Sequence, residues 1–240
     1  MKATGHSFIS NNYQAVTPQT KEAQYQFLLE LEKEGLEQLG LMSSQVWRDD
    51  PRRLLFVLAR YKFVAKMFAG MKKVLEVGCA DAFGTRIVRQ EVPEVVATDF
   101  DPVFIERNKA RPHPRWNITF KVHDMLAGPL AEDYDGVYAV DVIEHIPKAQ
   151  ERQFVGNLVA SLNVGGVCLL GTPSLQSQVY ASPPSKAGHV NCKDAPELKA
   201  LMSEFFHNVF IFSMNDEVIH TGFYPMAHCL WALCCHRKQL

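Results

Sequence analysis

The sequence predicts an α/β fold: a mostly parallel sheet with helices on both faces, preceded by a helical cap. From residue 73 onward, short apolar runs alternate with amphipathic segments, which is typical of parallel strands joined by helices. Before residue 70, apolar residues recur at helical spacing and no strand-like run interrupts them. We therefore expect a cap over residues 1–70 and one compact domain over residues 71–240.

Two helices are expected in the cap. The first is predicted after an N-cap at Thr17 or Thr20, in TKEAQYQFLLELEKEGLEQLGL, where the phenylalanine and four leucines share one helical face. The second begins near Asp50, carries Pro51 in its first turn and ends at Gly70.

The parallel part of the sheet is expected to contain five strands, separated by helices such as FGTRIVRQEV and PVFIERNKAR. A polar, proline-rich segment over residues 174–191 is expected to form a loop and to serve as a lid. Two strand-like runs after the helix APELKALMSEFF have no helix between them, which predicts an antiparallel end to the sheet. The five strands are KVLEVG, EVVATDFD, ITFKVHD, YDGVYAVDV and GGVCLLGTP.

Composition restricts the classes of partner. The 240 residues include 25 Lys plus Arg and 26 Asp plus Glu, for a formal net charge of −1, which provides no bulk attraction to nucleic acid or an anionic membrane. No apolar stretch reaches the roughly 18 residues of a membrane span, and the N-terminus lacks the apolar core of a secretory signal. The six cysteines form no CxxC pair, so we expect reduced thiols and a cytoplasmic location. The oligomeric state is left open.

The first predicted strand runs into a glycine turn, in the segment KKVLEVGCADAFGTRIVRQ. A dinucleotide site needs a second glycine where Ala80 stands, because the backbone there approaches a pyrophosphate. Asp81 would also direct negative charge toward that phosphate, and no Gly-Lys-Ser/Thr follows as in a P-loop. A phosphate cradle is therefore disfavoured.

An acidic residue stands at the end of the second strand as well. Asp99 follows the turn at about the roughly 20-residue distance at which a carboxylate meets ribose hydroxyls. Its two oxygens can accept both hydroxyl hydrogens. The alternative for Asp99 alone is a role in capping the helix that begins at Pro102.

Glu76, Gly78 and Gly84 resemble motif I of the class I S-adenosylmethionine (SAM) dependent methyltransferases, and residues 73–172 follow the family's order of elements. The resemblance implies a Rossmann-like, seven-stranded sheet with an antiparallel last strand. It also implies SAM as cofactor and S-adenosylhomocysteine (SAH) as product; no metal is predicted. The residues it assigns to the cofactor are Glu76, Gly78, Cys79, Ala80, Gly84, Asp99, Phe100, Asp124, Met125, Asp141, His145, Arg60 and Arg53.

Three groups of these assignments rest on segments that are similar to segments of the family. Asp124 follows the third strand, where the family often holds the adenine amino group, with Met125 beside it. YDGVYAVDVIEHIP is similar to the D-x-x-E-H segment after strand four. Arg53 or Arg60 would bind the SAM carboxylate through a bidentate pair. The alternatives are a surface turn for Asp124 and exposed helix arginines for the other two.

The resemblance also suggests a substrate side. His189, in GHVN, is similar in position to an active-site histidine of quinone-biosynthesis-type O-methyltransferases and could remove a proton from the acceptor. His220 is the second candidate, with Asp216 or Glu217 to orient it; both histidines could instead be ordinary loop residues. The aromatic residues expected to line the acceptor pocket are Tyr13, Trp47 and Tyr180.

The interpretation that follows is a methyltransferase acting on an oxygen or nitrogen of a small molecule: a sugar or nucleotide-sugar, a phenol or quinone, or a natural-product amine. The alternatives are an RNA or protein methyltransferase, a non-catalytic SAM-binding partner protein and, more remotely, an NAD-dependent dehydrogenase. Asp141 or Asp216 could ligate Mg²⁺, but no cluster in the sequence requires a metal. The acceptor and the general base stay open.

Overall fold

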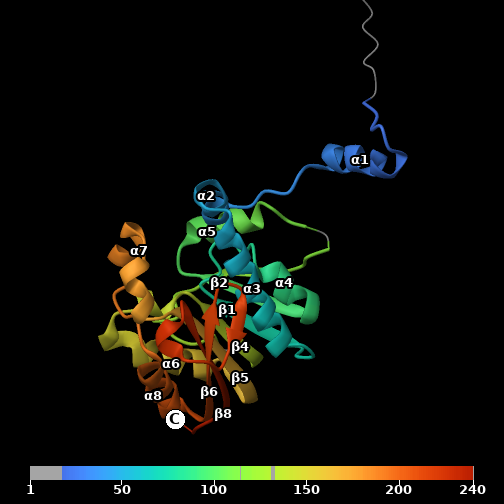
Figure 1. The fold of residues 1–240 in the computed structure, drawn as a ribbon. Helices are drawn as coiled ribbons and strands as arrows, with labels where there is room; N and C mark the ends of the chain where they lie inside the picture. Colours follow the sequence, from blue (N-terminus) through green and yellow to red (C-terminus); the bar gives the residue numbers. More distant parts are fainter. Residues whose placement is uncertain (1–17, 114, 131–132, 240) are drawn as a thin grey trace, which may run out of the picture. The chain divides into compact units, whose positions relative to one another are not determined.

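The computed structural model describes residues 18–113, 115–130 and 133–239. The chain divides into two compact units, Met1–Gln38 and Leu39–Leu240. Helix α1 (Gln26–Glu34) belongs to the first unit, and every strand belongs to the second (Figure 1). Helices α2 and α3 fall in the unit that holds the sheet. The separate roles expected for residues 1–70, as a cap, and for residues 71–240 remain a prediction.

The second unit alternates strands and helices along the chain. Among the described residues, no helix is long and apolar enough to cross a lipid bilayer. The bounds are α2 Leu41–Asp49, α3 Arg52–Met67, β1 Lys73–Val77, α4 Thr85–Glu91, β2 Glu94–Asp99, α5 Pro102–Lys109, β3 Thr119–Val122, β4 Tyr134–Val140, α6 Glu151–Ala160, β5 Leu162–Pro173, α7 Pro183–Gly188, α8 Ala195–Phe205, β6 Phe206–Asn215, β7 Val218–His220 and β8 Cys229–Arg237.

The described strands form one sheet in the order β3-β2-β1-β4-β5-β8-β6-β7. The first five are parallel, and β8 is inserted antiparallel between β5 and β6. This confirms the mostly parallel sheet with an antiparallel end. The expected number of strands, seven, was wrong, because the turn at Asp216, where φ is 48°, folds Val218–His220 back onto β6 as an eighth strand.

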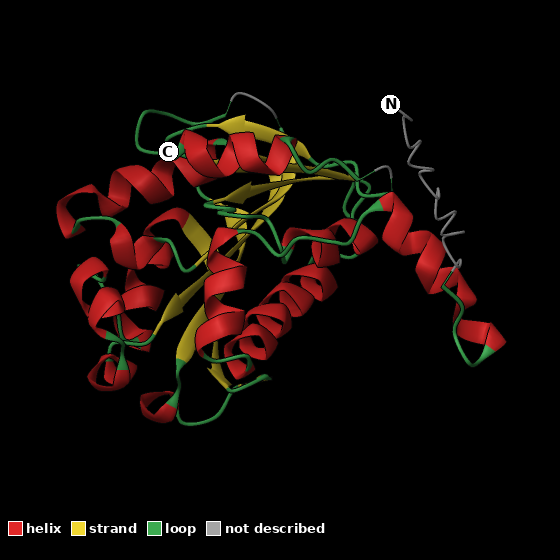
Figure 2. Ribbon diagram, turned by 90° about the horizontal axis from the view of Figure 1, so that it is seen from above, coloured by secondary structure: helices red, strands yellow, loops and turns green. Residues whose placement is uncertain are grey.

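Helices cover both faces of the sheet (Figure 2). Side chains alternate along each strand, so Val137 and Ala139 of β4 enter the core under α6 and α8, whereas Tyr138 enters the core under α3 and α4. Both cores are apolar and tightly buried. The strand sequences are therefore continuous apolar runs and do not alternate between apolar and polar residues.

The first predicted helix was too long. Helix α1 ends at Glu34 because Gly35 adopts a φ of 105°, a left-handed conformation that ends helices. A second positive φ, 97° at Gly40, precedes α2, a helix between the two predicted ones that was not expected from the sequence. The predicted helix from Asp50 to Gly70 is confirmed as α3, with Pro51 at its N-cap.

The segment 174–191 is not an irregular loop, as was expected. It contains a 3-10 helix, Gln176–Tyr180, and the short helix α7. The run SPPS, residues 182–185, is a helix start, in which the Ser182 hydroxyl accepts from the Ser185 backbone N–H and Pro183 occupies the first helical position.

A buried ion pair fixes the end of this segment. The Lys193 ammonium bonds to the carboxylate of Glu151, at the start of α6, and the Asn191 amide donates to the same carboxylate at 2.9 Å. Lys193 is only 3% exposed and Glu151 5%. Burial raises the pKa of a carboxyl, but here the hydrogen bonds from Lys193 and Asn191 outweigh it, and the pKa of Glu151 is lowered.

Replacing Lys193 by Met should lower the free energy of unfolding by about 3–5 kcal/mol, because it leaves the Glu151 carboxylate buried and unpaired. Urea denaturation measures this. The double variant Glu151→Gln/Lys193→Met should recover much of the loss, since it carries no buried charge. An equal loss of unfolding free energy in the single and the double variant would show that the unpaired charge is not the cause of the destabilisation.

Stability should also depend on pH through Glu151. Its folded-state pKa lies below the unfolded value of about 4.3, so its contribution is present above that pH and disappears as the pH falls through the folded pKa. We expect the difference in unfolding free energy between the wild type and Glu151→Gln to be present at pH 7 and to shrink below about pH 4. A difference independent of pH would contradict this.

Candidate active site

A pocket of about 680 Å³ lies at the carboxyl ends of β1, β2 and β4, where open parallel sheets bind ligands. Its size suits a drug-sized molecule. Of the residues predicted to bind a cofactor, those that line it are Arg60, Gly78, Cys79, Ala80, Gly84, Asp99, Phe100, Asp124, Met125, Asp141 and His145.

The glycine turn is held in shape by side chains from other strands and helices. Gly78 has a φ of 78° and Ala80 a φ of 45°, a conformation that costs a non-glycine residue roughly 1–2 kcal/mol. Asp99 Oδ2 accepts from the Ala80 N–H at 2.9 Å, and the Asn108 side chain donates to the Ala80 carbonyl at 2.8 Å. These bonds offset the strain, so alanine suffices where the sequence pattern has glycine.

The third motif residue, Gly84, is required for a different reason. Its φ is ordinary for a helix start, −78°. A Cβ there would lie 2.2 Å from the ring of Tyr61 in α3, and one on Gly78 would lie 2.4 Å from Val142. Both glycines therefore let neighbouring side chains close over the turn.

Glu76 does not line the pocket. Its carboxylate is buried behind the turn, where it accepts from the Tyr61 hydroxyl at 2.8 Å and from the Thr85 hydroxyl at 2.6 Å. Burial raises the pKa of Glu76, and the two hydrogen bonds partly offset this. Its contacts join β1 to α3 and α4 rather than reaching the cavity.

Asp99 and Asp124 place carboxylate oxygens on the pocket wall. Asp99 is 7% exposed, and each of its oxygens accepts one backbone N–H, from Ala80 and Asp101 at 2.9 Å. A carboxylate oxygen has two acceptor sites, so both oxygens can accept again. Asp124 is exposed, with one oxygen accepting from the Leu126 N–H at 2.9 Å.

One contact of an acidic side chain was not expected from the sequence. Asp81 was read as a charge disfavouring phosphate, but it accepts from the Ser43 N–H at 2.8 Å and the Ser43 hydroxyl at 3.2 Å. It thereby caps the first turn of α2, whose Met42, Ser43 and Val46 line the pocket. The cap joins residues 38 positions apart, so no local pattern could have indicated it.

An ion pair joins Arg60 of α3 to Asp141, just after β4. Arg60 Nη2 also lies 3.0 Å from Cys229 Sγ. Burial is the largest single influence and would lower the pKa of the guanidinium, but Asp141, Cys229 and Glu144 together outweigh it and raise that pKa, so Arg60 is charged. Arg60 Nε and Asp141 Oδ1 are buried without a hydrogen-bond partner among the described residues.

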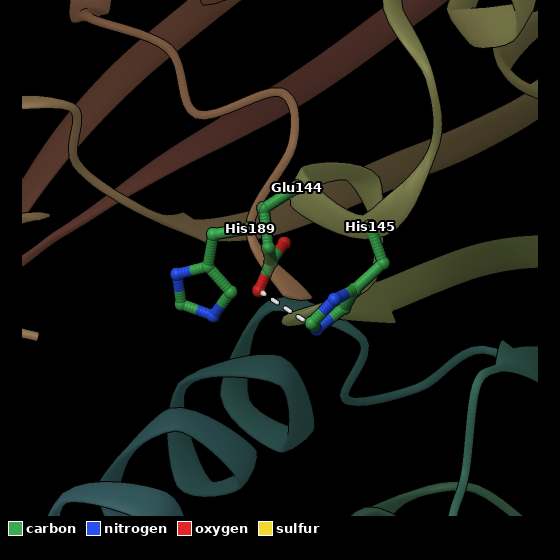
Figure 3. Close-up of side chains that lie close together, drawn as sticks. All are labelled: Glu144, His145 and His189. Carbon is green, nitrogen blue, oxygen red and sulfur yellow. Dashed lines mark ion pairs between the residues drawn. The ribbon is translucent and has the colours of Figure 1, made fainter. Parts of the chain in front are cut away.

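Glu144, His145 and His189 meet beside this ion pair (Figure 3). The two imidazole rings lie 5.1 Å apart between centroids, edge to face. Burial, followed by the charge of Asp141, raises the pKa of Glu144 to about 8. Burial and the neighbouring His145 lower the pKa of His189. His145 lines the pocket, whereas His189 is not one of its lining residues.

Other candidates lie away from the pocket. His220 is on the edge strand β7, where Nε2 donates to Asn215 at 2.8 Å and Nδ1 accepts from the Gly222 N–H at 2.9 Å, so neither Asp216 nor Glu217 orients it. Arg53, Trp47 and Tyr180 are exposed and do not line the cavity; Tyr180 is 88% exposed. Tyr13 is outside the described residues.

Comparisons with known proteins agree with this geometry. A family model described as "Methyltransferase domain" matches residues 74–166. A Mycolicibacterium smegmatis protein described as a probable SAM-dependent methyltransferase is 32% identical over 148 residues, 59% of this chain and 54% of that protein. The chain thus spans about half the length of this curated relative.

Solved structures share the fold. The N-methyltransferase NodS from Bradyrhizobium japonicum, in complex with SAH, superposes with a TM-score of 0.56 at 20% identity, over 87% of this chain and 97% of that one. A TehB-like SAM-dependent methyltransferase from Corynebacterium glutamicum gives 0.60 at 16% identity, over 81% and 96%. Residues 74–166 are thus similar to a methyltransferase domain, and the chain shares the fold of SAM-dependent methyltransferases.

Replacing Glu76 by Ala should destabilise the fold, because the Tyr61 and Thr85 hydroxyls lose their shared acceptor. The loss expected is about 1–3 kcal/mol for each hydroxyl left unpaired, measured by urea denaturation. Thr85→Val is the matched control, since it removes one of the two bonds and should cost less. If Glu76→Ala weakened SAH binding without destabilising the fold, Glu76 would be a ligand contact instead.

Proposed function

We propose that this protein is a SAM-dependent methyltransferase that transfers a methyl group to an oxygen or nitrogen of a small-molecule acceptor. The observation that carries the proposal is the pocket at the strand ends, whose lining includes the Asp99 carboxylate and the Arg60–Asp141 pair. No phosphate-binding glycine pattern accompanies them. The pocket thus suits a nucleoside that carries an amino acid instead of a pyrophosphate.

The polar groups of the pocket complement such a molecule. Asp99 has free acceptor capacity for two ribose hydroxyls, and Asp124 has a free oxygen for an amino group. Arg60 and Asp141 both line the pocket, so a carboxylate and an ammonium group of the ligand would each meet an oppositely charged side chain. Met125 and Phe104 add apolar surface for a planar base.

The chain's own groups then bind, orient and shield the reactants. SAM, when bound, supplies an electrophilic methyl group on a sulfonium. Asp99 and Arg60 would hold the two ends of the cofactor, which aligns it with the acceptor and provides most of the acceleration that such a reaction needs. His145 lines the pocket and His189 packs against the His145 ring, and the proposed role of His189, when its Nε2 is free, is to accept the proton of the acceptor.

The acceptor class is part of the proposal. A net charge of −1 supports a small molecule over RNA. NodS is described as an N-methyltransferase, but at 20% identity it supports the fold and leaves the choice between oxygen and nitrogen open. The unpaired, mostly buried cysteines support the proposed cytoplasmic location.

Isothermal titration of the purified protein with SAH tests the cofactor site. The wild type should bind SAH and should show no heat with NAD. Asp99→Asn should weaken SAH binding by about 10- to 150-fold, because it removes a charge-assisted hydrogen bond worth about 1.5–3 kcal/mol.

Asp101→Asn is the matched control for this titration. Asp101 lies two residues further on, caps α5 and is not on the pocket wall, and Asn caps helices as well as Asp does. It should bind SAH like the wild type. Equal affinity in Asp99→Asn and Asp101→Asn, or tighter binding of NAD than of SAH, would overturn the proposed site.

A further inference from the structure

Three side chains beside the pocket direct ligand atoms toward one point. One ligand atom from each of Glu144, His145 and His189 lies within 4.8 Å of the other two. His145 Nε2 is 4.0 Å from Glu144 Oε1. Figure 3 shows the Glu144 carboxylate between the two imidazole rings. The spacing leaves room for an ion among the three atoms.

Both histidines are held in the tautomer that a metal ligand needs. His145 Nδ1 donates to the Gly188 carbonyl at 2.9 Å, and His189 Nδ1 donates to Gln178 Oε1 at 2.7 Å. Each ring therefore keeps a lone pair on Nε2. Metal-binding histidines are oriented in the same way, by an oxygen that accepts the other ring N–H.

The third ligand atom lacks a partner of its own. The Glu144 side chain is fully buried, and Oε2 accepts from the Thr172 hydroxyl at 3.1 Å. Oε1 has no hydrogen-bond partner among the described residues. A buried carboxylate oxygen without a partner is costly, and a cation at the meeting point of the three side chains would satisfy it.

We propose that Glu144, His145 and His189 form a binding site for a divalent transition-metal ion. Two imidazoles and one carboxylate favour ions such as Zn²⁺, Fe²⁺ or Co²⁺ over Mg²⁺ and Ca²⁺, which prefer all-oxygen sets. Three protein ligands leave coordination positions open. This revises the expectation that no metal takes part.

Neighbouring segments hold the three ligands together. The Glu144 carbonyl accepts from the Val190 N–H at 2.8 Å and the Asn191 N–H at 3.0 Å, which fixes His189 against the segment that carries the other two ligands. The Lys193–Glu151 pair fixes the same chain two residues further on. The ligands thus sit on a supported framework even though His145 is half-exposed.

A bound ion would change the role of His189 in methyl transfer. This part of the inference rests on the proposed function. The metal would take the Nε2 lone pair of His189, so His189 would act as a ligand and not as a free base. An acceptor hydroxyl reaching an open coordination position beside His145, on the pocket wall, would have its pKa lowered by the ion. Metal binding itself does not depend on methyl transfer.

Titration of the metal-depleted full-length protein with Co²⁺ tests the site, read by calorimetry and by the visible absorption of the bound ion. We expect one equivalent per chain. His189→Gln, His145→Gln and Glu144→Gln should each weaken binding by about 100-fold or more. Gln178→Leu, which only removes the partner of His189 Nδ1, should weaken it by about 10- to 100-fold.

His220→Gln is the matched control, because His220 is bonded at both ring nitrogens on the edge strand; it should bind Co²⁺ like the wild type. Melting temperatures without metal show which variants fold, and Gln178→Leu carries the test if a ligand variant does not fold.

Absence of Co²⁺ binding, equal binding by the wild type and His189→Gln, or preference for Mg²⁺ would each overturn the site. SAH binding by the same protein would then leave the proposed function standing, whereas Co²⁺ binding without SAH binding would overturn the function alone.

Discussion

The buried carboxylate of Glu76 is the interaction on which the rest of the site depends. It stands at the end of β1 and accepts hydroxyl hydrogen bonds from α3 and from the first residue of α4. The glycine turn between β1 and α4 must therefore pass around it, with Gly84 tight against the Tyr61 ring. A carboxylate in a core is costly unless its hydrogen bonds are made, so both helices have only one favourable position over the turn.

The geometry of the pocket follows from that position. With the turn held, the Ala80 N–H meets Asp99 on β2 and Asp81 meets the first turn of α2. The carboxylates of Asp81 and Asp99 thus accept hydrogen bonds from backbone N–H groups, and their remaining acceptor sites face the cavity. A site of this kind is formed before any ligand arrives, which lowers the entropic cost of binding.

The features that the sequence predicted well are those at strand ends. Gly78, Asp99 and Asp141 follow apolar runs directly, and parallel strands bring their ends to one edge of the sheet. The orientation of side chains was less predictable. Glu76 points away from the cavity because strand alternation places it on the α3 face, and Asp81 turns toward α2, a helix that was not predicted from the sequence. The meeting of His145 with His189 spans 44 positions and depends on α7, which was read as a loop.

The D-x-x-E-H segment shows how a short stretch can serve two neighbouring sites. Asp141 has a φ of 56°, and the chain then enters the 3-10 turn Ile143–His145. The reversal directs Asp141 toward Arg60 and turns Glu144 and His145 toward His189. A regular helix from Asp141 onward would place residues three and four positions apart on one face, so Asp141 would share a face with Glu144 and His145. The positive φ at Asp141 therefore separates Asp141, which pairs with Arg60, from Glu144 and His145, which face His189. The structure tolerates the strain at Asp141 because its carboxylate is paired with a buried arginine.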